Sequence, residues 1–414
     1  MLLDALSLRG ASKALSRITS SFMPTLKVPK WQTGRLWMLR LGYYELHRPK
    51  EKADDWVWIV DHKVQVGAIK CFVILGIRLK NVPPTGQSLA HQDMEVIDII
   101  PVEKSNKDIV LGHLEENIKK TSIPRLIVGD YGPDLKAGVE MFCQKHPQTD
   151  FIYDIKHKTA AVLKKELAKN ERWDEFQKQA TLTKHRLQKN FLTHLVPPNQ
   201  RAQSRYMNVD ILVEWGQNIL AFLDEEKGKE SSEYDQEKLQ EKLGWVIAFR
   251  QSIYDWAEMI RVTKTIERFV RTQGLYRNAV LDLEKRLGNV ANTEHAQNVY
   301  KELMDFARQE TSKARKGECL LGSSEVIESV FGKLKYLEKA QSKSGFTVLI
   351  LSIGAMISST SSEVIQTALE FVSTQKILDW RQKMLGESVQ SKRRKALKTH
   401  RKTEQKLRHC FSKI

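Results

Sequence analysis

Continuous apolar runs separated by polar or Gly/Pro segments dominate the chain between residues 56 and 153. Runs of this length and composition are typical of buried β-strands. They predict strands at 56–60, 71–79, 95–102, 125–129 and 151–153. Apolar positions at i, i+3 and i+4 spacing predict helices after the third, fourth and fifth strands, at 109–119, 134–143 and 159–168.

The order of these elements predicts the arrangement of the sheet. Short connections join the first three strands, which favours an antiparallel meander. The last two strands follow helices, which favours parallel additions to the same sheet. The sequence therefore predicts an α/β fold with a mixed five-stranded sheet and flanking helices, the order found in the ribonuclease H-like fold.

A short helical segment precedes the sheet. Helical patterns at 2–16 and 31–41 have Arg9, Lys13, Arg35 and Arg40 among their polar positions. Two short helices with basic faces are compatible with helix-turn-helix DNA binding, so residues 1–48 are interpreted as a DNA-binding segment. The alternative is a helical cap over the next domain.

Helical patterns return after the fifth strand. Residues 169–317 contain few strand signals and four tryptophans, enough aromatic bulk for a core of their own. We predict that this segment is an all-helical insertion that divides the catalytic core into 49–168 and 318–385. Residues 386–414 form a basic tail, in which Lys392, Arg393 and Arg394 either contact DNA backbone or are simply solvated.

Composition narrows the class of partner. The formal net charge of +17 favours a polyanion, with nucleic acid ahead of an anionic membrane surface. The longest apolar run, 346–357, is too short to span a bilayer. The four cysteines form no CxxC pair, which favours a reducing setting and leaves any metal site to be built from oxygen ligands.

Two aspartates stand where predicted strands end. Asp61 follows the first strand and Asp130 follows the fourth, and these two strands are expected to be neighbours. Adjacent carboxylates repel unless one is protonated or a cation lies between them. Mg²⁺ or Mn²⁺ suits such an all-oxygen site, and two ions can catalyse phosphodiester chemistry. Two aspartates supply too few ligands, so a third carboxylate on a neighbouring helix is expected.

The helical pattern at 323–335 offers that carboxylate. Glu328 and Lys335 lie two turns apart on one flank of the apolar stripe of this helix. They are either a metal ligand and a phosphate contact or two solvated neighbours. Glu325 competes for the same role but lies nearer the helix start. Asp154 rivals Asp130, although its basic neighbours suggest phosphate contact or a helix start.

Three blocks of this chain resemble the acidic blocks of DDE-type transposases of prokaryotic insertion sequences. They are WIVDHK around Asp61, LIVGDYGPDL around Asp130 and SSEVIESVFGKLK around Glu328. Ser324 departs from the asparagine that is commoner in that family. The resemblance implies that Asp61, Asp130 and Glu328 are the catalytic and metal-binding residues. It also implies that Lys335 holds a phosphate, and that His157 and Lys158 do so with it.

The resemblance also implies an activity and its setting. Two Mg²⁺ or Mn²⁺ ions would support cleavage at transposon ends and transfer of the 3′-hydroxyl into target DNA. The partners would be double-stranded DNA and further copies of the chain. The protein would be cytoplasmic in a prokaryote and associated with the nucleoid. Two alternatives stay open: a ribonuclease H-like nuclease or resolvase without strand transfer, and an inactive DNA-binding protein derived from a transposase.

Overall fold

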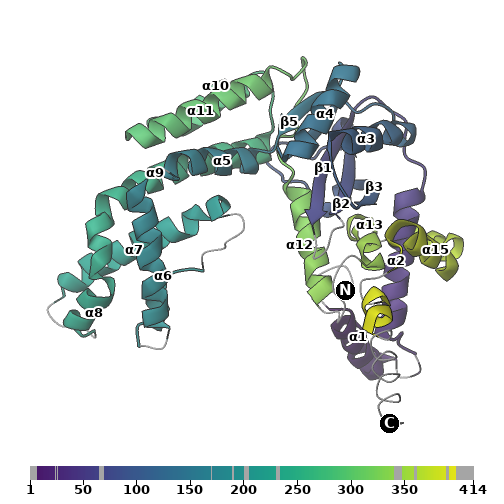
Figure 1. The fold of residues 1–414 in the computed structure, drawn as a ribbon, viewed down its shortest axis with the longest axis horizontal. Coiled ribbons are helices and arrows are strands. Elements are labelled where there is room, and N and C mark those ends of the chain that lie inside the picture. Colours follow the sequence, from purple (N-terminus) through teal and green to yellow (C-terminus); the bar gives the residue numbers. More distant parts are fainter. Residues whose placement is uncertain are drawn as a thin grey trace, which may run out of the picture. The chain divides into compact units, whose positions relative to one another are not determined.

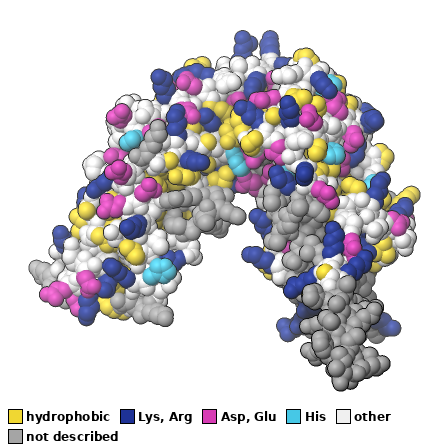
Figure 2. Space-filling model, viewed as in Figure 1, with side chains coloured by type: hydrophobic (Ala, Val, Ile, Leu, Met, Phe, Trp, Pro, Cys, Tyr) yellow, Lys and Arg dark blue, Asp and Glu magenta, His cyan; other side chains and the backbone are white. Residues whose placement is uncertain are grey.

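The computed structural model describes residues 7–23, 25, 27–64, 70–168, 170–188, 191–199, 205–229, 234–339, 347–358, 361–387 and 391–397. The chain divides into two compact units (Figure 1). Unit 1 contains residues 1–84, 88–152 and 324–414, and unit 2 contains 85–87 and 153–323. On the visible face of each unit, Lys and Arg are interspersed with Asp and Glu (Figure 2).

Unit 1 is built on a mixed five-stranded sheet in the order β3-β2-β1-β4-β5. β1 pairs antiparallel with β2, β2 pairs antiparallel with β3, and β1 pairs parallel with β4. This topology confirms the predicted ribonuclease H-like fold. The strands are β1 (Trp56–Val64), β2 (Lys70–Arg78), β3 (Glu95–Val102), β4 (Leu126–Gly129) and β5 (Asp150–Tyr153).

Helices α3 (Lys107–Thr121) and α4 (Pro133–Lys145) cover one face of this sheet. Trp56, Trp58 and Val60 of β1 belong to the same buried cluster as apolar residues of the two helices. Their spacing of two residues follows from the alternation of side chains along a strand. Pro133 occupies the first turn of α4, where its missing N–H has no helical partner to lose.

The opposite face of the sheet is covered by α12 (Glu325–Lys339), α13 (Ser352–Ile357) and α2 (Trp31–His47). α12 contacts β1, and α13 and α2 contact β3. Val57 and Ile59 alternate with the residues that face α3 and α4, and they are also fully buried. β1 is therefore enclosed on both faces, which explains its continuous apolar sequence.

α2 is an integral part of unit 1. It packs against α13, α14 (Ser362–Phe371) and α15 (Thr374–Leu385) as well as α1 (Leu8–Phe22). The eight residues between α1 and α2 exceed the three or four that usually join a helix-turn-helix pair. These contacts favour the helical-cap alternative for α2.

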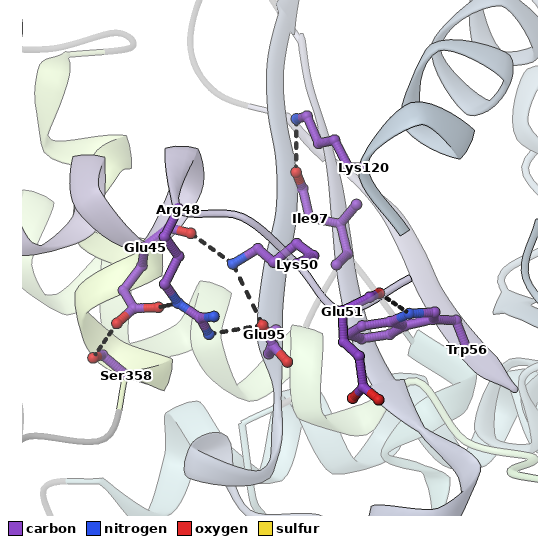
Figure 3. A network of polar contacts seen from close by, with 9 residues as sticks. All are labelled: Glu45, Arg48, Lys50, Glu51, Trp56, Glu95, Ile97, Lys120 and Ser358. Atoms are coloured by element: carbon purple, nitrogen blue, oxygen red, sulfur yellow. Dashed lines mark hydrogen bonds and ion pairs between the residues drawn. The ribbon is translucent and has the colours of Figure 1, made fainter. Parts of the chain in front are cut away.

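A network of polar contacts joins the end of α2 to the sheet (Figure 3). Arg48 bridges Glu45, at 2.5 Å, and Glu95 of β3, at 2.7 Å. Lys50 donates to the carbonyl of Glu45 at 2.7 Å, and Ser358 donates to the Glu45 carboxylate at 2.8 Å. Burial lowers the pKa of Lys50 to about 8. The buried charges are thus matched to partners from three separate segments.

Unit 2 is helical, as predicted for the insertion. Trp173 and Trp256 meet edge to face with ring centroids 4.9 Å apart, and Phe176 contacts both of them as well as Trp215 and Trp245. This aromatic cluster gives the unit its own core. Its main helices are α5 (Ile155–Leu167), α6 (Glu171–Leu187), α7 (Val209–Lys227), α8 (Gln236–Leu243), α9 (Arg250–Gln273), α10 (Ala279–Leu287) and α11 (Glu294–Thr311).

The unit starts earlier and ends later than the predicted insertion of 169–317, because it includes α5 and residues up to 323. Among the helices that the structure describes, none combines the length and the apolar character needed to cross a membrane.

Candidate active site

The two predicted aspartates lie at neighbouring positions in the sheet. Asp130 directly follows β4, as predicted. Asp61 does not end its strand as predicted, because β1 continues to Val64 and Asp61 pairs with Val73 of β2. β2, the antiparallel partner of β1, extends further than β4 does. Pairing with β2 therefore continues β1 as a strand beyond the apolar run.

The register between β1 and β4 places the two aspartates side by side. Val60 pairs with Gly129, so Asp61 and Asp130 are the next residues on the two strands. Adjacent strands lie about 4.8 Å apart. By alternation both side chains are directed to the face that also carries Val57 and Ile59. This is the face of the sheet on which α12 contacts β1.

Each aspartate is held by a nearby backbone N–H group. Asp61 Oδ1 accepts from the N–H of His62 at 2.6 Å, and Asp130 Oδ1 accepts from that of Gly132 at 3.1 Å. A Cβ on Gly129 would lie 3.0 Å from the carbonyl oxygen of Val60. The glycine before Asp130 thus permits close approach of the two strands at the point where the carboxylates emerge.

α12 carries the third predicted acid. The stripe predicted from spacing is buried, and its members are Val326, Ile327, Val330, Phe331, Leu334 and Leu337. Glu328 on its flank is half-buried and Lys335 is exposed. Glu325 is the first residue of the helix, where an acidic side chain interacts favourably with the helix dipole. Glu328 is therefore presented from a helix on the same face as Asp61 and Asp130.

A polar cluster on the other face of the sheet was not anticipated from the sequence. His62 Nε2 lies 3.1 Å from Ser105 Oγ, and Lys70 Nζ lies 3.5 Å from Asp134 Oδ2. Burial lowers the pKa of His62. Burial opposes ionisation of Asp134, yet a hydrogen bond with Ser105 and the charges of His62 and Lys70 lower its pKa overall. The sequence feature that could have indicated this cluster is the position of His62 directly after Asp61.

Lys158, one of the two predicted phosphate contacts on α5, has an ion-pair partner within unit 2. Lys158 Nζ lies 2.9 Å from Glu302, which also binds Lys165 at 2.8 Å. Asp154 follows β5 and caps α5, accepting from the N–H of His157 at 2.8 Å. Lys158 is therefore part of an ion-pair network, and Asp154 starts a helix, one of the two roles that its neighbours suggested.

The basic residues of the N-terminal helices differ in their surroundings. Arg40 donates to the carbonyl oxygens of Val372 and Leu369 at the end of α14, and its contact with DNA stays a prediction. Arg35 is half-buried, and burial lowers its pKa. Arg9 and Lys13 are exposed, with the Arg9 guanidinium 5.0 Å from the ring centre of Trp31.

Within the predicted tail, the structure describes residues 386–387 and 391–397, and 391–397 is helical. Lys392, Arg393 and Arg394 are exposed on this helix. Residues 388–390 and 398–414 of the predicted tail lie outside the described residues. Exposed Lys and Arg side chains at these positions are compatible with contact to a phosphate backbone.

Asp61 and Asp130 suit a hard divalent cation, because their carboxylates offer only oxygen atoms, the ligands that Mg²⁺ and Mn²⁺ prefer. The third predicted ligand, Glu328, lies on α12, which contacts β1. Cations would also offset the repulsion between the two aspartates.

Neither a scan against protein-family models nor a search of curated proteins gave a match to this chain. Among solved structures, the chain is similar to the Drosophila P element transposase strand transfer complex, with a TM-score of 0.38 and 11% sequence identity. The match covers 85% of this chain and 89% of that chain. A similarity of this size does not by itself establish function.

Proposed function

We propose that this protein is a DDE-type transposase, a metal-dependent polynucleotidyl transferase that cleaves DNA at transposon ends and joins the 3′-hydroxyl to target DNA. One observation carries the proposal. Asp61 and Asp130 follow the last β1–β4 pair of a ribonuclease H-like sheet, on the face where α12, the helix that carries Glu328, contacts β1. The three motif blocks around these residues are consistent with the same assignment.

In this proposal Asp61, Asp130 and Glu328 hold two Mg²⁺ or Mn²⁺ ions. When bound, such ions activate the attacking oxygen and stabilise the leaving oxygen of a phosphodiester. The backbone donors at His62 and Gly132 orient the two aspartates. Lys335, exposed two turns after Glu328, binds a phosphate near the scissile bond.

The remaining basic residues supply affinity for DNA backbone. The net charge of +17 favours contact with double-stranded DNA, both transposon ends and target. Arg9 and Lys13 on α1 and the exposed 391–397 helix are the contacts that we propose. The motif resemblance favours a prokaryotic insertion-sequence enzyme that acts in the nucleoid-associated cytoplasm and assembles as a homo-oligomer on DNA.

The metal site can be tested by following thermal unfolding while Mn²⁺ is added. A ligand that binds only the native state raises the melting temperature, because it stabilises that state by RT ln(1 + [L]/Kd). We expect this rise for the wild type and for Glu325→Gln, and we expect it to be lost in Asp61→Asn and Glu328→Gln. Equal stabilisation of the wild type and Asp61→Asn by Mn²⁺ would refute the site.

Strand transfer separates the proposal from its two alternatives. The substrate is a pre-cleaved end from the DNA that flanks the gene, and the target is a supercoiled plasmid. Joined products support the transposase. Nicked plasmid without joined product indicates a nuclease or resolvase, and DNA binding without either product indicates an inactive derivative.

A further inference from the structure

Two kinds of contact hold α12 in unit 1. Its buried apolar stripe packs on the sheet and on α13. Hydrophobic contacts are non-directional, so they select the buried side of a helix more closely than its exact rotation or axial position. A side chain that binds a metal must be held to within about 0.5 Å of its productive place. A directional contact close to Glu328 would supply that precision.

One such contact joins α12 to the segment between β2 and β3. His91 Nε2 lies 3.0 Å from Ser329 Oγ, a hydrogen-bond distance. Ser329 directly follows Glu328 in the helix, so a restraint on Ser329 also restrains the backbone that carries Glu328. Ser329 is exposed and His91 is half-buried. The bond therefore holds α12 from a side that the apolar stripe does not cover.

His91 itself lies on a well-anchored turn. It begins η2 (His91–Asp93), a short helical turn that contacts α13. The N–H of Met94 donates to the His91 carbonyl at 3.1 Å. Glu95, the next residue, starts β3 and pairs with Arg48 at 2.7 Å (Figure 3). The imidazole thus reaches α12 from a base that is fixed on both of its sides.

The charge state of His91 suits a contact of this kind. Burial and, to a smaller extent, the charge of Lys333 lower the pKa of His91. A neutral imidazole has one nitrogen that donates and one that accepts, and a serine hydroxyl can pair with either. The contact is thus a neutral hydrogen bond, whose main effect is on geometry.

We propose that His91 is a positioning residue, whose hydrogen bond with Ser329 fixes α12 so that Glu328 is held in place as the third metal ligand. This inference rests on the proposed function, because it gives His91 a part in presenting that ligand. Loss of either partner in the hydrogen bond removes none of the three carboxylates, but it lowers the precision with which Glu328 is held.

The test measures Mn²⁺ binding to the full-length protein by isothermal titration calorimetry, with urea unfolding of each variant in parallel. Loss of a residue that orients a metal ligand typically weakens metal binding about 10–100-fold. We expect the dissociation constant to rise about tenfold in His91→Ala and in Ser329→Ala, the low end of that range, because the support is indirect. His91→Gln should stay closer to the wild type, since its amide can pair with the Ser329 hydroxyl.

Two further variants separate positioning from a general loss of stability. If His91 acts through Ser329, the variant that lacks both side chains should bind Mn²⁺ no more weakly than either single variant. The matched control is His113→Ala, which removes a half-buried histidine of α3 that lies 3.4 Å from Glu116. It should keep the wild-type affinity for Mn²⁺ even where its urea midpoint falls.

The outcomes distinguish this inference from the proposed function. Wild-type Mn²⁺ affinity in His91→Ala would overturn the positioning role and leave the metal site intact. Additive losses in the double variant would also overturn it, because the histidine would then act independently of Ser329. If Mn²⁺ bound the wild type and Asp61→Asn equally well, the metal site itself would fail, and His91 would have no ligand to position.

Discussion

The crossing of α2 and α13 offers a sharp test of whether the N-terminal helices belong to the core. Gly42 and Gly354 face each other where the two helices meet. A Cβ on Gly42 would lie 1.8 Å from the carbonyl oxygen of Leu351, and one on Gly354 would lie 2.7 Å from that of Gly42. Both obstacles are backbone atoms, which cannot rotate away as a side chain would. Gly42→Ala must therefore separate the helices.

The expected cost follows from this geometry. An ordinary contact needs more than 3.4 Å, so the helices must shift by more than an ångström in a close-packed interior. Overpacking of this kind typically costs 1–3 kcal/mol, occasionally more, and the helix preference of alanine returns about 1 kcal/mol. The 1.8 Å approach to a backbone oxygen places the cost at the upper end of that range, so we expect Gly42→Ala to lower the free energy of unfolding of unit 1 by about 2 kcal/mol. For a unit of this size that is a fall in melting temperature of roughly 4–8 °C.

Differential scanning calorimetry measures this change, because the two units can unfold in separate transitions. Only the transition of unit 1 should shift in Gly42→Ala. Gly112→Ala in α3, where an added Cβ would meet no atom within 4 Å, is the matched control. It should raise stability by roughly 0.5–1 kcal/mol. An unchanged transition in Gly42→Ala would show that α2 does not pack tightly on α13. It would also favour the interpretation of residues 1–48 as a separate segment.

Two further predictions concern single side chains. Asp154→Asn should keep nearly all of the wild-type stability, because asparagine caps a helix as well as aspartate does, whereas Asp154→Ala should lose about 1 kcal/mol in urea unfolding. A large loss of Mn²⁺ affinity in Asp154→Asn would instead make Asp154 a metal ligand. Lys50, with its pKa lowered to about 8 by burial, should make the native state more stable as pH rises from 8 towards 10.5. In that window the unfolded chain retains a proton that the native state has released, and the gain is at most about 3 kcal/mol. It is measured as the difference between wild type and Lys50→Met in urea unfolding, and a difference independent of pH would contradict it.

Several features of the fold were predictable because they depend on local sequence. Continuous apolar runs marked the five strands, since a strand enclosed on both faces has no solvent-exposed position. The spacing of Val326, Val330 and Leu334 identified the buried side of α12 and so placed Glu328 on its flank. The polar residues Asp61 and Asp130 stood out because each directly followed such a run.

The limits of prediction were set by contacts between distant segments. β1 continues through Asp61 because β2 pairs with it, and the apolar run alone could not reveal that length. His62, Ser105 and Asp134 meet only because the sheet and α4 bring three separate segments together. The domain interpretation of the N-terminus also depended on a packing partner, α13, that lies over 300 residues away.

The sequence by itself thus determined the order of the elements, their buried sides and the three acids of the proposed site. Only the tertiary structure decided which charges are available to a ligand. Arg40 donates to a carbonyl 332 residues away, and Lys158 pairs with Glu302, 144 residues away. Periodicity reports burial, which is a property of one segment, whereas the partner of a charge depends on every segment that folds against it. Lys335 remains exposed on α12, and its proposed ligand is a DNA phosphate.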